Sequence, residues 1–173
     1  MKCLWSPWRM DYILAKKEKG CLFCRKPKEK KDKENLILYR GKTAFIVMNR
    51  FPYNNGHLMV IPNRHCVDLD ELNDEESQEL CFLIRLSLRV LKEAFHPHGF
   101  NVGLNIGNAG GAGEPHLHLH VVPRWNGDTN FMPALGETKV IPEYLARTYE
   151  KLYPAFKGSG RKGEKREKGG RRR

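Results

Sequence analysis

Three histidines alternate with apolar residues in the segment HLHLH, and they are the side chains of this chain best suited to chemistry. They are His116, His118 and His120. In a β-strand, residues two positions apart lie on the same face, roughly 6.5–7 Å from one to the next. A solvent-facing strand could alternate polar residues for solubility, but Lys, Thr or Glu would serve that purpose better. The pattern therefore favours a cluster of imidazoles with a chemical role.

A glycine-rich turn at residues 107–113 comes shortly before the histidines. Glycines allow several backbone N–H groups to point together into a cavity, which suits the oxygens of an anion. Such turns are common in hairpins, so this one is informative only because the histidines follow it. Together they predict that Gly111, Ala112 and Gly113 hold a phosphate while an imidazole nitrogen attacks phosphorus.

Two cysteines, Cys21 and Cys24, have the CxxC spacing of a metal-ligand pair. Two small buried residues in a turn would have the same spacing. The second CxxC that usually completes a zinc site is absent from the sequence. The spacing alone leaves both readings open.

The rest of the sequence predicts the elements that position these residues. Residues 74–95 predict one long helix, because apolar residues recur at helical spacing and Asn73 with Glu76 can form a capping box. A last helix is predicted from Pro142 to about Tyr153. Strand-like runs lie at 36–40, 43–49, 57–62, 100–107 and 116–125. Strands joined by short turns, with one long helix, predict an α+β domain with a mostly antiparallel sheet of about five strands.

The charge is concentrated at the C-terminal end. The chain has 173 residues and a net charge of +11, and residues 157–173 hold nine Lys and Arg against two Glu, or +7. This segment has no aromatic or aliphatic residue, so we expect one domain over 1–156 and a disordered tail over 157–173. The tail either adds solubility or contacts a polyanion, and its charge does not separate the two.

The sequence predicts a cytoplasmic protein that does not enter a membrane. Its apolar stretches are too short for a transmembrane helix, and its first residues do not form a signal peptide. Five cysteines, an odd number, argue against a disulfide framework.

Three segments resemble the histidine triad (HIT) superfamily of nucleotidyl hydrolases and transferases. These are Asn49 to His57, Asn105-Ile106-Gly107, and the triad followed by Val-Val. The SPWRMDYI start and the HLHLHVVPRW segment are most similar to the diadenosine tetraphosphate phosphorylase and hydrolase branch. The resemblance covers about residues 4–125 and extends to the final helix.

The resemblance implies a nucleotide-binding site and a two-step mechanism at the α-phosphate of a dinucleoside polyphosphate. His118 matches the nucleophile of the family, which forms a covalent nucleotidyl-histidine intermediate that phosphate or water then resolves. His120 matches the histidine that donates to phosphate oxygens. Asn49 matches a ribose-side residue, and Asn105 matches a position beside the transferred phosphate. Most relatives pair, so a homodimer is implied.

The resemblance also implies a structural zinc ion. Zinc-binding relatives complete the site with a histidine after the third strand and the first histidine of the triad, which implies Cys21, Cys24, His65 and His116 as ligands. Cys66 is a rival ligand.

Two positions qualify this picture. Many relatives carry Ser, Thr or Gln shortly before the first histidine, whereas this chain has Glu114, which would repel phosphate if it pointed inward. His57 begins a predicted strand, and we expect it to pack or to form local hydrogen bonds rather than to take part in chemistry.

Functions of another class stay open. The basic tail would suit a nucleic-acid-binding protein or one that processes adenylated DNA ends, but the body lacks a nucleic-acid motif. A nucleoside phosphoramidase would use the same histidines. A sugar-phosphate nucleotidyltransferase is disfavoured, because the triad of that branch ends in Gln.

Overall fold

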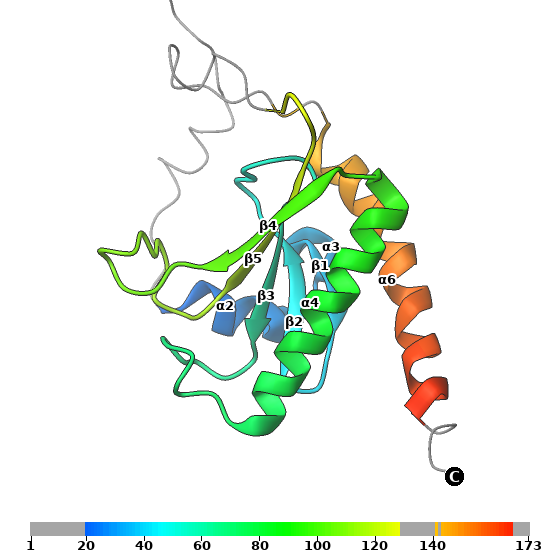
Figure 1. The fold of residues 1–173 in the computed structure, drawn as a ribbon. Coiled ribbons are helices and arrows are strands. Elements are labelled where there is room, and N and C mark those ends of the chain that lie inside the picture. Colours follow the sequence, from blue (N-terminus) through cyan, green and yellow to red (C-terminus); the bar gives the residue numbers. More distant parts are fainter. Residues whose placement is uncertain (1–19, 129–140, 142, 168–173) are drawn as a thin grey trace, which may run out of the picture.

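A five-stranded antiparallel sheet forms the centre of the computed structural model, which describes residues 20–128, 141 and 143–167 and, over 159–167, the backbone alone. The strands lie in the order β1-β2-β3-β5-β4. Their bounds are β1 Ile37–Arg40, β2 Ala44–Met48, β3 Leu58–Pro62, β4 Gly99–Leu104 and β5 Leu119–Arg124. The prediction of an α+β domain with a mostly antiparallel sheet is confirmed (Figure 1).

The long helix α4 spans Asp74–Phe95, as the apolar spacing predicted. The side chain of Asn73 accepts the amide of Glu76, and the Glu76 carboxylate accepts the amide of Asn73, so the capping box is present. Arg64 donates to the same carboxylate at 2.8 and 2.9 Å. The beginning of α4 is therefore fixed by the sequence that precedes it.

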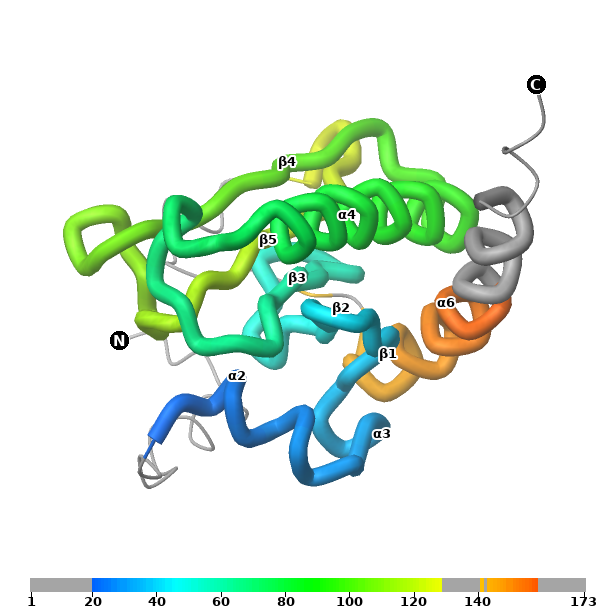
Figure 2. Tube along the Cα trace, turned by 90° about the horizontal axis from the view of Figure 1, so that it is seen from below, coloured from blue at the N-terminus to red at the C-terminus, as the bar shows by residue number. Residues whose placement is uncertain are grey.

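The two faces of the sheet bury different groups. Residues of β2, β3 and β5 that face α4 and α6 (Leu145–Glu167) join one large apolar core, which includes Ile46, Val60 and Val121. The alternate residues of β2 and β3 join Phe23 and Ile37 in a smaller apolar cluster on the other face. Figure 2 shows α4 on one side of β2 and β3 and the short helices α2 (Leu22–Arg25) and α3 (Asp32–Asn35) on the other. The side chain of His120 points to the second face, because it alternates with Leu119 and Val121 along β5.

The strand of the triad begins later than predicted. β5 starts at Leu119, so His116 and His118 precede its paired region. The reason is that the pairing of β3 with β5 ends at Val60 and Leu119. The amide of Leu117 instead donates to the Cys66 carbonyl at 2.8 Å, which draws this segment toward the residues after β3.

The last helix, α6, is longer than predicted. It spans Leu145–Glu167, beyond the expected end at Tyr153 and into the basic segment. Lys, Arg and Glu favour a helix over this stretch, whereas Gly158, Gly160 and Gly163 disfavour it, so helix propensity alone does not explain the extension. Pro142, the predicted first residue, lies outside the described residues, as does the SPWRMDYI segment. The division into a domain of 1–156 and a tail of 157–173 stays a prediction.

Among the residues that the structure describes, no helix has both the length and the apolar character needed to cross a membrane.

Candidate active site

The three histidines of the triad are buried side by side with a fourth. His116, His118 and His120 are each at most 9% exposed, and His57 is 1% exposed. The rings of His118 and His120 are 4.9 Å apart, and those of His57 and His120 are 5.0 Å apart. Phe23 packs on the ring of His118 at 5.3 Å. A group of imidazoles is thus held against a partly apolar wall.

The hydrogen bond of His118 determines which of its nitrogens can react. Its Nδ1 lies 2.7 Å from the carbonyl oxygen of His116, which can only accept. Nδ1 therefore carries the proton, and Nε2 keeps its lone pair. His118 has the tautomer that a nucleophile requires.

A chain of hydrogen bonds determines the tautomer of His120 in the same way. The amide of Tyr53 donates to Nδ1 of His57 at 3.0 Å, so the proton of His57 is on Nε2. That Nε2 donates to Nδ1 of His120 at 2.9 Å, so the proton of His120 is also on Nε2. Among the described residues this buried Nε2 has no hydrogen-bond partner. Burial, with the nearby charge of His118, lowers the pKa of His120 to about 4, which keeps the ring neutral.

His57 belongs to this buried histidine cluster, which the sequence analysis did not predict. It does not bond only locally, because it contacts His120 across 63 residues of chain. Leu58 pairs with Val121 and Met59 pairs with His120, which places His57 diagonally beside His120 on the same face. The register of β3 against β5 would have been needed to find it, and the sequence does not supply that register.

The two asparagines lie at the edges of this cluster. Nδ2 of Asn49 is 3.4 Å from Nδ1 of His57, and its Oδ1 accepts the amide of Phe51 at 2.9 Å. Asn105 follows β4 directly, one residue after Leu104, which pairs with Leu119. Contact of either asparagine with a nucleotide stays a prediction.

The glycine-rich turn uses some of the amides that were expected to bind phosphate. The amide of Gly111 donates to the Asn108 carbonyl at 3.0 Å, and that of Ala112 donates to the Gly107 carbonyl at 3.2 Å. The amide of Gly113 has no such backbone partner among the described residues. In this conformation Gly113 offers a donor, whereas Gly111 and Ala112 would first have to give up their bonds within the turn. Glu114 is half-buried and forms no hydrogen bond with a described histidine.

The four residues expected to bind a metal lie together. One ligand atom from each of Cys21, Cys24, His65 and His116 lies within 4.8 Å of the others. Nδ1 of His116 is 3.2 Å from Cys21 Sγ and 3.5 Å from Cys24 Sγ. A tetrahedral zinc site has ligand–ligand distances of roughly 3.3–3.8 Å, since Zn–S is about 2.3 Å and Zn–N about 2.0 Å.

The hydrogen bonds of His116 suit this use. Its Nε2 lies 3.0 Å from the Pro62 carbonyl oxygen, so Nε2 carries the proton and Nδ1 is available to a metal. Burial raises the pKa of the Cys24 thiol, and its neighbour Cys21 adds to the effect, so a cation would stabilise the thiolates. Cys66, the rival, is not one of the four clustered residues, and its carbonyl accepts the amide of Leu117.

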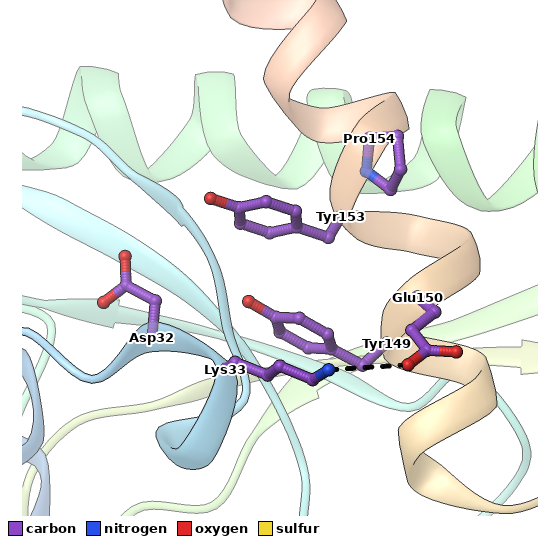
Figure 3. A pocket seen from close by; sticks show the side chains of 6 residues that line it. All are labelled: Asp32, Lys33, Tyr149, Glu150, Tyr153 and Pro154. Atoms are coloured by element: carbon purple, nitrogen blue, oxygen red, sulfur yellow. Dashed lines mark ion pairs between the residues drawn. The ribbon is translucent and has the colours of Figure 1, made fainter.

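A cavity of about 300 Å³ lies elsewhere, between α3 and α6. Figure 3 shows the stacked rings of Tyr149 and Tyr153 facing Asp32, with Lys33 paired to Glu150. It contains none of the histidines, and Asp32 and Lys33 are already paired with other charged groups. We therefore do not assign chemistry to it.

The sequence of this chain is similar to one protein family and to several named proteins. The HIT domain family model matches residues 30–127, more than half of the chain. The AP-4-A phosphorylase of Mycobacterium tuberculosis is 45% identical over 155 residues, which cover 84% of this chain and 79% of that protein. The asymmetrical bis(5'-nucleosyl)-tetraphosphatase of Schizosaccharomyces pombe is 32% identical over 92 residues, 53% of this chain and 50% of that protein.

A solved structure has a similar fold. A Zn-bound histidine triad family protein from Mycobacterium smegmatis superposes with a TM-score of 0.67 at 26% identity, over 82% of this chain and 96% of that one. The triad, the extent of the family match and these relatives agree. The chain belongs to the HIT family.

Proposed function

We propose that this protein is a nucleotidyl transferase or hydrolase that acts at the α-phosphate of a dinucleoside polyphosphate, with His118 as nucleophile. The observation that carries the proposal is the pair of defined tautomers. His118 presents a lone pair on Nε2, and His120 presents a buried, unpartnered Nε2–H beside it. A nucleophile next to a preorganised donor is what attack on a phosphorus centre requires.

The reaction has two displacements. In the first, the Nε2 lone pair of His118 forms a bond to the α-phosphorus while the bond from phosphorus to the bridging oxygen breaks, and the nucleoside polyphosphate leaves. The Nδ1–H of His118 keeps its hydrogen bond to the His116 carbonyl. The dipole of this carbonyl therefore stabilises the positive charge that the imidazole ring carries once Nε2 is bonded to phosphorus. In the second, an oxygen of hydrogen phosphate or water attacks the same phosphorus, the P–N bond breaks with its electron pair returning to Nε2 of His118, and the proton of the attacking group passes to solvent. His120 Nε2–H can donate to the phosphoryl oxygens in both steps.

The substrate class and the acceptor rest on the relatives. The names AP-4-A phosphorylase and bis(5'-nucleosyl)-tetraphosphatase both refer to dinucleoside polyphosphates as substrates. The first has the higher identity and the longer match, so we propose diadenosine tetraphosphate as substrate and phosphate as acceptor, with water as the alternative. The products would be ADP and ATP.

We also propose that Zn²⁺ is held by Cys21, Cys24, His65 and His116 as a structural ion. Two thiolates and two imidazoles are a closed tetrahedral set that leaves no position for substrate. The ion would join the start of α2 to the segment after β3 and to the triad, only two residues before His118. The homodimer, the cytoplasmic location and a contact of the basic tail with a polyanion stay predictions.

Product analysis tests the function. Diadenosine tetraphosphate is incubated with the wild type and with His118→Ala, with and without inorganic phosphate. ADP and ATP that form only with phosphate support the phosphorylase, and AMP and ATP that form with water support the hydrolase. Turnover that survives in His118→Ala would exclude the nucleophile, and no turnover by the wild type would exclude this substrate. Nucleoside phosphoramidates and adenylated DNA ends would then be the next substrates to measure.

A further inference from the structure

The loop between β2 and β3, residues 49–57, carries both groups that define the tautomer of His120. The amide of Tyr53 sets the proton of His57, and His57 sets that of His120. Three residues lie between them, and the side chains of the first two, Asn54 and Asn55, point to other parts of the molecule. Each is bound by a separate cluster of polar groups.

The first anchor binds Asn54 to the end of β5. Asn54 is 6% exposed, and its Nδ2 donates to the Pro123 carbonyl at 3.0 Å and to Asp128 Oδ2 at 2.7 Å. Asp128 also accepts two hydrogen bonds from Arg124 at 2.7 Å and the amide of Trp125 at 3.0 Å. These bonds would stabilise the turn after β5 even without Asn54, so Asp128 already has a local structural role.

The second anchor binds Asn55 to α6 and has no such local explanation. The hydroxyl of Thr148 lies 2.6 Å from Glu143 Oε2 and 3.0 Å from Asn55 Oδ1, and Nδ2 of Asn55 donates to the same Glu143 oxygen at 3.2 Å. Thr148 is fully buried. The bond from Thr148, followed by that from Asn55, lowers the pKa of Glu143, so the carboxylate stays ionised and accepting.

We propose that Thr148 is a positioning residue for the reaction of the triad. Its single hydroxyl proton goes to Glu143, at 2.6 Å, and the same carboxylate oxygen accepts from Asn55 Nδ2. Through Glu143 and Asn55, Thr148 holds the loop in the conformation in which the Tyr53 amide meets His57, and so it keeps the proton of His120 on Nε2. The inference rests on the proposed function for its effect on rate, but the tautomer itself can be measured without substrate.

The geometry of the loop explains why a contact at Asn55 would reach His57. Only Gly56 separates the two residues, and it has a φ of +73°, which favours glycine. A Cβ on Gly56 would lie 3.3 Å from both Leu91 and Pro123, so the backbone here fits tightly against α4 and β5. A change in the position of Asn55 therefore passes into the backbone of Gly56 and His57, because little free space can absorb it.

The test compares two substitutions on the same helix. Thr148→Val keeps the shape of the side chain and removes the hydroxyl. Tyr149→Phe removes a buried hydroxyl that donates to the Ile37 carbonyl at 3.1 Å, away from the loop, and so serves as the matched control. The ring nitrogens are followed by ¹H–¹⁵N correlation NMR of the metal-loaded, substrate-free protein, with the His120 signals assigned from a His120→Gln variant. Thr148→Ser, which keeps the hydroxyl, tests rescue, and Asn55→Ala tests the other side of the contact on a partly exposed residue.

We expect the wild type, Thr148→Ser and Tyr149→Phe to show His120 protonated on Nε2 alone. Thr148→Val and Asn55→Ala should show a mixture of tautomers and a kcat about tenfold lower with little change in KM, a smaller loss than the deletion of a transition-state donor causes. An unchanged His120 tautomer in both variants would overturn the proposal, and so would an equal change in Tyr149→Phe. If the tautomers behave as expected but the wild type does not cleave diadenosine tetraphosphate, the proposed function fails and the positioning role stands.

Discussion

The two faces of the sheet are made by the same strands but have different tasks. On the face toward α4 and α6, the inward residues of β2, β3 and β5 are apolar and join one continuous core. On the opposite face the alternate residues include His57 and His120, and the apolar cluster around Phe23 is smaller. Along β5 the change from one task to the other takes a single residue, from Leu119 to His120.

The comparison shows how a small domain can bury imidazoles without losing its fold. The helix-covered face supplies most of the buried apolar area, and that area stabilises the folded state. The other face can then hold polar rings whose burial costs free energy unless they are hydrogen-bonded. Each of the four histidines has at least one hydrogen-bond partner. Among the described residues, the fully buried ring nitrogen that lacks a partner is Nε2 of His120, which we propose donates to the substrate.

The largest effect should come from the donor on the histidine face. His120→Asn removes the Nε2–H, whereas in His120→Gln the side-chain amide reaches the same position. We expect kcat to fall by roughly 10²–10³ in the first variant and by much less in the second. The melting temperature should fall in His120→Gln, because Gln lacks an acceptor at the position of Nδ1 for the buried Nε2–H of His57. Steady-state kinetics and thermal unfolding measure the two effects. Equal losses of rate would mean that Nε2–H does not act on the substrate.

Loss of the metal on the histidine face should lower the stability of the protein. Removal of Zn²⁺ with a chelator, or Cys24→Ser, should lower the free energy of unfolding by about 4 kcal/mol, the value for an ion present at about a thousand times its dissociation constant. Cys81→Ser is the matched control, because Cys81 is exposed on α4 and outside the cluster. Metal analysis and thermal unfolding with added zinc make the measurement. The proposed ligands would be contradicted if the protein purified without zinc and its melting temperature did not change when chelator was added.

A cavity on the face toward α4 and α6 should lower the stability of the protein without lowering its kcat. Ile46 is fully buried between β2 and α4, so Ile46→Ala should lower the free energy of unfolding by roughly 2–5 kcal/mol. The kcat of the folded fraction should stay near that of the wild type, measured well below the lowered melting temperature. A tenfold fall in kcat without unfolding would show that the two faces are not independent.

The smallest expected effect is on the pH dependence of stability, which should differ between the two faces of the sheet. The pKa of His120 is about 4 in the folded protein and near 6.5 in the unfolded chain, so between these values the unfolded chain takes up the proton first. Stability contributed by the neutral ring is present above pH 6.5 and lost toward pH 4, by less than about 3 kcal/mol. The pKa of Glu76 is about 2 because of its bonds with Arg64 and Asn73, so its contribution is present above pH 4.5 and is lost below it.

Denaturant titrations at each pH would distinguish the two windows. His120→Gln should remove the pH dependence between 6.5 and 4 and leave the lower window in place, and Glu76→Gln should do the reverse. A dependence between 6.5 and 4 that survives in His120→Gln would assign this window to another group.

Local patterns predicted most of the fold. The bounds of α4 and its capping box follow from neighbouring residues, because caps and apolar spacing act within one or two turns. The metal cluster was found through the resemblance, since ligand types at Cys21 and His116 are visible but their meeting is not. The His57–His120 bond and the late start of β5 depend on the register of strands far apart in sequence, which no local pattern encodes. The length of α6 was underestimated because a segment without apolar residues was expected to be disordered, and no local pattern there predicts a helix.

The distance along the chain between the site residues has a consequence for how the protein folds. β1, β2 and β3 are neighbours in sequence and close only short loops, whereas Cys21 meets His116 across 95 residues. The entropy of closing such a long loop must be met before the contact can form, and contacts of this kind slow folding. We therefore expect the metal cluster to assemble after the first hairpins. The triad segment would reach its final geometry only once nearly the whole domain has closed around it.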